Sequence, residues 1–116
     1  MAEDLIARFE ALLTKGGDGA ALRLALASRY LDSGDVAGAV RHAEAAVRLD
    51  PEYSAAWKAF GRALAAAGRA TDALAAYERG AKVAEQRGDV QAAKEMRVFA
   101  KRLRRDAVKP EDEKDG

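Results

Sequence analysis

Residues 54–87 read SAAWKAFGRALAAAGRATDALAAYERGAKVAEQR, and residues 20–53 read AALRLALASRYLDSGDVAGAVRHAEAAVRLDPEY. These stretches are two copies of one unit with a period of 34 residues, and they agree best at apolar, small and glycine positions. A period of this length is typical of stacked helical units, which bury their apolar faces against one another. The pattern therefore predicts how the chain is built, and it favours binding as the activity.

Helical periodicity runs through nearly the whole chain, without sustained strand alternation. We expect six helices, over about 2–14, 20–32, 36–49, 53–67, 71–87 and 89–108. Gly34 suits the position just past a helix end, Asp35 and Asp89 can cap the helices that follow them, and Pro110 favours an end near Val108. Short connections make consecutive helices antiparallel.

The composition is that of one soluble globular domain, with 116 residues, 49% hydrophobic and 34% charged. The chain has no cysteine, which excludes disulfides and thiolate metal sites. It lacks a signal-peptide pattern and an apolar run of about 18 residues, so we expect a cytoplasmic protein without a membrane partner. The net charge of +1 combines −3 over 1–53, +7 over 54–109 and −3 over 110–116.

The second copy contains the pattern Trp57-x-x-Phe60-Gly61-x-x-Leu64, followed by Ala73-x-x-x-Tyr77. This pattern resembles the tetratricopeptide repeat (TPR) family. The first copy fits it in part and departs at Arg23, where the family prefers Trp, and at Ala43, where it prefers an aromatic. The positions that carry the resemblance are Leu26, Ala27, Tyr30, Ala39, Pro51, Trp57, Phe60, Gly61, Leu64, Ala73 and Tyr77.

The resemblance implies an all-α fold of antiparallel helical hairpins, stacked as a short right-handed solenoid in one domain over residues 1–109. We expect a half-repeat helix over 1–19, repeats over 20–53 and 54–87, a capping helix over 88–109, and a disordered charged tail over 110–116. The first helix should bury a stripe of Leu5, Phe9 and Leu12. The layout is similar to that of small stand-alone bacterial TPR proteins.

Residues suited to catalysis are sparse in this sequence. His42 is the single histidine, and we interpret it as facing solvent beside Arg41 and Glu44. The glycine-rich stretch 16–19 lacks the Gly-Lys-Ser/Thr ending of a phosphate loop, which favours a turn between helices. No pair of carboxylates has surroundings that would separate two pKa values. We therefore expect no enzyme, no metal, no cofactor and no small-molecule substrate.

The resemblance also indicates a binding surface, because the first helix of each TPR unit lines a concave groove. The positions that correspond to this groove are Leu24, Ser28, Leu31, Lys58, Arg62 and Ala65. Lys58 and Arg62 are four residues apart, so they share one helix face and suit an acidic peptide or a terminal carboxylate. The expected function is a non-catalytic protein–protein interaction module that holds a peptide or helix of another protein.

Two alternatives stay open at this point. The run Lys101-Arg102-Leu103-Arg104-Arg105 could bind nucleic acid or another anionic surface. No aromatic residue is interleaved to stack bases, so a solvated face of the capping helix is favoured and nucleic acid is disfavoured. The second alternative is a structural subunit that self-associates, although a monomer or weak homo-oligomer is the expected state.

Overall fold

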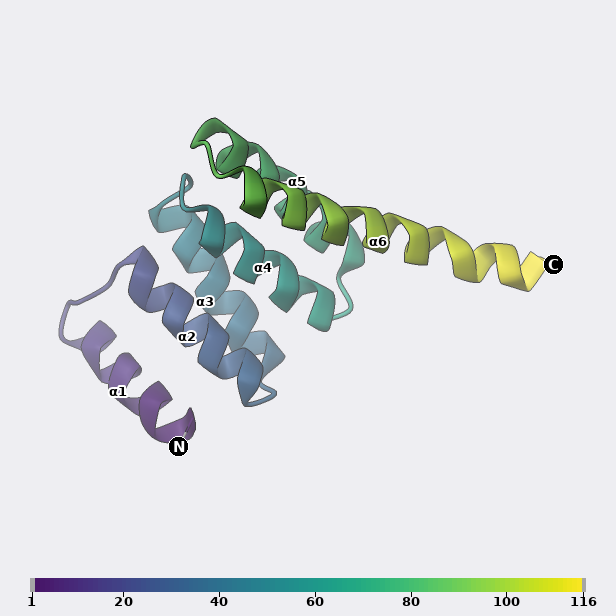
Figure 1. The fold of residues 1–116 in the computed structure, drawn as a ribbon. Coiled ribbons are helices and arrows are strands. Elements are labelled where there is room, and N and C mark those ends of the chain that lie inside the picture. The colour runs from purple at the N-terminus through teal and green to yellow at the C-terminus, as the bar shows by residue number, and fades with distance from the viewer. Residues whose placement is uncertain (1, 116) are drawn as a thin grey trace.

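The computed structural model describes the backbone of residues 2–115 and the side chains of residues 4–107. Within that part the chain forms six helices and no strand. The helices are α1 Ala2–Thr14, α2 Ala20–Asp32, α3 Val36–Leu49, α4 Ser54–Ala66, α5 Ala70–Gln86 and α6 Val90–Asp115. Consecutive helices pack as hairpins, and α4 lies beside both α2 and α6 (Figure 1). The predicted all-α stack of hairpins is confirmed.

Local backbone chemistry places most helix ends where the sequence predicts them. The bounds agree for α1, α2 and α3, and to within one residue for α4 and α5. Gly34 follows α2 with a φ of 88°, a left-handed conformation that glycine adopts without strain. The side chains of Asp35 and Asp89 accept hydrogen bonds from backbone amides of the next helix, at 2.9 Å and 3.1 Å.

The two helices of each repeat approach closely because a tyrosine ring of one lies on a glycine of the other. A Cβ atom at Gly61 would lie 2.6 Å from Cε1 of Tyr77, and one at Gly38 would lie 2.8 Å from Cδ1 of Tyr30. These distances are shorter than any normal carbon contact, so a larger residue at either glycine would push the hairpin apart.

Side chains from neighbouring repeats pack in three apolar clusters of the described residues, linked by partly buried side chains. The largest fully buried side chains in this part of the chain are Leu26, Leu64 and Met96. Trp57 and Phe60 pack between the small residues of α3 and those of α5, so they lie between neighbouring units. The indole nitrogen of Trp57 donates to the carbonyl of Pro51 at 2.8 Å, so the ring is also fixed at its polar edge.

The predicted stripe of α1 is wrong at one position. Leu12 is 48% exposed, whereas Leu13 is half-buried together with Phe9. Phe9 and Leu13 are four residues apart and share one helix face, so the buried face is turned by one residue from the predicted stripe.

The last helix is longer than predicted. Its helical backbone passes through Pro110 and continues to Asp115, while Gly116 lies outside the described residues. The predicted end near Val108 is therefore wrong, whereas the disordered tail over 110–116 stays a prediction. Proline removes one backbone donor from a helix and disfavours it, but does not forbid it.

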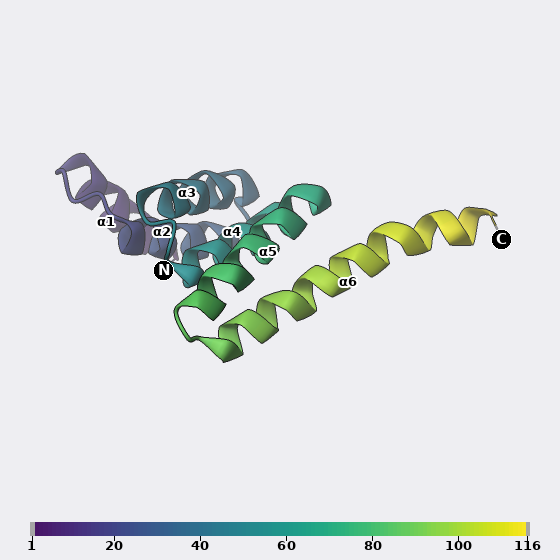
Figure 2. The ribbon, with the colours of Figure 1, turned by 90° about the horizontal axis from the view of Figure 1, so that it is seen from above.

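The second half of α6 extends beyond the stack, as two perpendicular views show (Figures 1 and 2). In the described part of the chain, no helix is sufficiently long and apolar to cross a membrane.

Candidate functional site

The predicted binding positions of α2 lie on a partly open face. Leu24 and Leu31 are half-buried, and Ser28 is exposed between them. The three residues follow one side of the helix at spacings of four and three. This face offers apolar contact with a polar centre, and α2 lies beside α4, which carries the other predicted positions.

The two predicted cations of α4 differ in their surroundings. The ammonium group of Lys58 forms an ion pair with Glu95 of α6. Arg62 is exposed and has no ion pair with any described side chain. The sequence-based picture of two free cations is therefore incomplete, because Glu95 already neutralises one of them. Arg62 is the free cation of this pair.

Ala65, the third predicted position of α4, lines a cavity of about 170 Å³ between α4, α5 and α6. We call this space the Tyr77 cavity, and its lining residues are Ala65, Tyr77, Phe99, Arg102, Leu103 and Asp106. The rings of Tyr77 and Phe99 contact each other, with centroids 5.3 Å apart. The cavity thus has aromatic and aliphatic walls, with one cation and one carboxylate at its edge.

Tyr77 brings a polar group to this cavity. The residue is 4% exposed, and its hydroxyl makes no hydrogen bond to any side chain or backbone among the described residues. Burial raises the pKa of the hydroxyl, and the nearby charge of Arg62 opposes that rise. The phenol is therefore protonated at neutral pH and can donate a hydrogen bond to an incoming group.

The sequence did not predict that α6 contributes to this site, because that helix was interpreted as a cap or as a basic surface for anions. In the sequence, Arg102 and Leu103 belong to one basic run over 101–105. In the structure Arg102 lines the Tyr77 cavity, whereas Lys101 and Arg104 line a different groove against α5. The basic run is thus divided between two surfaces.

The prediction that His42 faces solvent is wrong. His42 is 2% exposed, and its Nε2 lies 2.9 Å from Oε1 of Glu10, while its Nδ1 lies 3.1 Å from Nη1 of Arg23. Because a guanidinium group can only donate, Nδ1 accepts, and Nε2 carries the proton and donates to Glu10. The hydroxyl of Tyr30 donates to the same carboxylate oxygen at 2.9 Å.

This network joins α1, α2 and α3 and serves structure. Burial lowers the pKa of His42, an effect that the nearby Glu10 opposes and that Arg41 and Arg23 strengthen. The Tyr30 and His42 rings stack, with centroids 5.1 Å apart. Among the described side chains, no group of three or more histidine, cysteine or acidic residues could hold a metal ion.

Stacked helical hairpins with repeated close contacts define a helical-repeat protein. The profile of the tetratricopeptide repeat family matches residues 30–96. The chain is 46% identical over 101 residues to TPR repeat-containing protein PA0015 of Pseudomonas aeruginosa, covering 87% of this chain and 96% of that protein. The chain belongs to the tetratricopeptide repeat family.

A solved structure agrees with this assignment. The solution structure of a protein from Bordetella parapertussis matches with a TM-score of 0.74 and 40% sequence identity, covering 87% of this chain and 88% of that one. TPR proteins are generally non-catalytic scaffolds that mediate protein–protein interactions, and family membership indicates that class of function here.

Proposed function

We propose that this protein is a non-catalytic interaction module that captures a peptide or helix of another protein on the face formed by α2, α4 and α6. One observation supports this proposal most directly. The Tyr77 cavity opens beside the predicted position Ala65, and the buried Tyr77 supplies a hydroxyl that has no partner within the described residues. No fully buried side-chain oxygen or nitrogen of the described residues lacks a hydrogen-bond partner, so the Tyr77 hydroxyl reaches open space and is available to a bound group or a water.

The proposal includes a way in which a segment would bind. An apolar side chain of the partner enters the Tyr77 cavity and packs against Phe99 and Leu103. A carbonyl or carboxylate oxygen accepts the hydrogen bond of the Tyr77 hydroxyl. Arg62 and Arg102, which have no ion pair with a described side chain, favour a segment with acidic character.

The remaining predicted positions have supporting parts in this proposal. Leu24 and Leu31 extend the apolar contact along α2, and Ser28 provides a hydrogen-bonding group between them. Lys58 fixes α6 against α4 through Glu95. It contacts an acidic ligand only after that ion pair opens, so Arg62 contributes more to recognition than Lys58.

Substitutions in the cavity test the proposal. A partner isolated from the native cell by affinity capture is titrated against wild type, Tyr77→Phe and Arg62→Ala by calorimetry. We expect each variant to bind about 5- to 30-fold more weakly, with a nearly unchanged thermal midpoint, because each removes one polar contact at an interface. Arg79→Ala, an exposed cation of α5 that lies outside this face, is the matched control.

If the partner binds both cavity variants as tightly as wild type, the proposed surface is wrong. The two alternatives from the sequence, an anion binder acting through α6 and a self-associating subunit, stay predictions, as does the cytoplasmic location. A gel shift with DNA and RNA at low salt tests the first alternative, and light scattering over a range of concentrations tests the second.

A further inference from the structure

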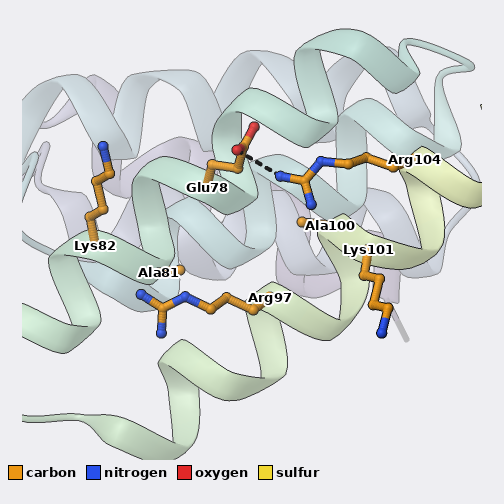
Figure 3. A pocket seen from close by; sticks show the side chains of 7 residues that line it. All are labelled: Glu78, Ala81, Lys82, Arg97, Ala100, Lys101 and Arg104. Carbon is orange, nitrogen blue, oxygen red and sulfur yellow. Dashed lines mark hydrogen bonds and ion pairs between the residues drawn. The ribbon is translucent and has the colours of Figure 1, made fainter.

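A second concave feature lies between α5 and α6, and none of its lining residues belongs to α2 or α4. Its volume is about 430 Å³. We call it the α5–α6 groove, and its lining residues are Glu78, Ala81, Lys82, Arg97, Ala100, Lys101 and Arg104 (Figure 3). The two alanines are buried and form the floor between the helices.

The two arginines of this groove already form ion pairs with carboxylates of α5. Nη2 of Arg104 lies 2.8 Å from Oε2 of Glu78, and Nη2 of Arg97 lies 2.9 Å from Oε2 of Glu85. Figure 3 shows the Glu78–Arg104 pair crossing from one helix to the other. The carboxylates of Glu78 and Glu85 therefore hold the two arginine side chains in place.

The lysines of the groove have no such partners. Lys82 of α5 and Lys101 of α6 are exposed, and neither forms an ion pair with any described side chain. They extend from opposite rims of the groove (Figure 3). The four cations of the lining thus exceed the two carboxylates that pair with them, which leaves a positive surface with two free ammonium groups.

Charge rather than close packing determines what this surface can hold. On α4, Gly61 lets the ring of Tyr77 lie directly on the helix backbone. On this side α6 instead presents Arg97, Lys101 and Arg104, at spacings of four and three. These long side chains keep another helix away from the backbone, while their charged ends remain available to an anionic partner.

We propose that the α5–α6 groove binds an acidic segment of a protein, whose carboxylates pair with Lys82 and Lys101 and extend the row formed by Glu78 and Glu85. Nucleic acid fits the surface less well, because no aromatic side chain lines the groove to stack bases. The groove lies apart from the Tyr77 cavity, so this proposal stands independently of the proposed function.

Binding of a defined acidic peptide tests the proposal. Fluorescein-labelled hexaglutamate is titrated at low salt against wild type and the double variant Lys82→Glu/Lys101→Glu. We expect saturable binding to wild type and a loss of at least about tenfold in the variant, since each reversal replaces an attraction by a repulsion. The control is Lys94→Glu/Arg105→Glu, which makes the same charge change on α6 outside the groove, and it should lose less than about threefold.

Three outcomes would overturn the proposal. Hexaglutamate shows no saturable binding, or both double variants lose affinity equally, or an oligothymidine of equal charge binds more tightly than hexaglutamate. Lys82 and Lys101 are exposed and unpaired, so the variant should keep its thermal midpoint. If it does not, Lys82→Gln/Lys101→Gln serves as a second variant, and an unchanged affinity there also refutes the proposal.

Discussion

The junction of α1, α2 and α3 and the junction of α4, α5 and α6 have interiors of different chemistry. The first encloses a hydrogen-bonded network of Glu10, Arg23, Tyr30 and His42. The second buries Tyr77, Ala81, Ala84, Ala93, Met96 and Ala100 in an apolar cluster. Arg23 occupies the repeat position that Trp57 holds one unit later. The same position of the 34-residue repeat therefore accepts either a charged or an aromatic side chain.

The close contact between tyrosine and glycine within each repeat can also be built in two ways. In the first repeat the tyrosine is on α2 and the glycine on α3, as Tyr30 and Gly38. In the second repeat the glycine is on α4 and the tyrosine on α5, as Gly61 and Tyr77. Close approach needs one large and one absent side chain, and the assignment to the two helices can be reversed.

Truncating the apolar junction should have the largest effect. Met96 is 0% exposed, so Met96→Ala removes buried methylene groups and leaves a cavity. We expect a loss of about 2–5 kcal/mol in the free energy of unfolding, measured with urea at pH 7.5 and again at pH 5.5, with the same loss at both. Val98→Ala on the same helix is the control, since Val98 is 54% exposed and should cost less than about 0.5 kcal/mol. Equal losses for the two would contradict the comparison.

Breaking the polar junction should have an intermediate effect. Glu10→Ala leaves the Nε2 proton of His42 and the hydroxyl of Tyr30 without their acceptor. We expect a loss of about 1–3 kcal/mol by the same measurement. Glu44 occupies the corresponding position one repeat later, and its one ion pair with a described side chain is to Arg48, at 3.6 Å, so Glu44→Ala should change stability by at most about 0.5 kcal/mol. A Glu10→Ala variant as stable as wild type would show that the network contributes nothing.

Lowering the pH should have the smallest effect, and it should destabilise the polar junction and not the apolar one. Burial holds the pKa of His42 below its ordinary 6.5, so the folded chain favours the neutral ring. Above pH 6.5 this preference contributes its full stability. Below it the unfolded chain binds the proton more readily, and the free energy of unfolding falls by at most about 1.4 kcal/mol per pH unit. His42 is the single histidine, so His42→Gln should flatten the profile between pH 7.5 and 5.5. A slope that persists in this variant would assign the effect to other groups.

Local chemistry explains what could be predicted from the sequence. Helix bounds follow from neighbouring residues, as in the capping of α3 by Asp35 and the end of α2 at Gly34. The burial of Tyr77 and the place of Trp57 follow from the 34-residue register, because repeated units must bury the same positions. These features depend on short-range spacing, which a sequence displays directly.

The missed features depend on contacts between distant residues. His42 has partners 19 and 32 residues away, and Lys58 pairs with Glu95 of another helix. One signal was available, since Arg23 replaces an aromatic at an interior position of the repeat. A charged side chain there requires polar partners, and Arg23 has two: the carboxylate of Asp18, which accepts two hydrogen bonds at 2.8 and 3.1 Å, and Nδ1 of His42.

The attachment of α1 has a consequence for how its motion can be observed. The imidazole proton of His42 is enclosed by a carboxylate that arrives from a different helix. When the first helix swings away, that proton meets solvent even though the repeats stay intact. The rate at which this proton exchanges with heavy water, measured by nuclear magnetic resonance, therefore reports the opening of α1 separately from global unfolding.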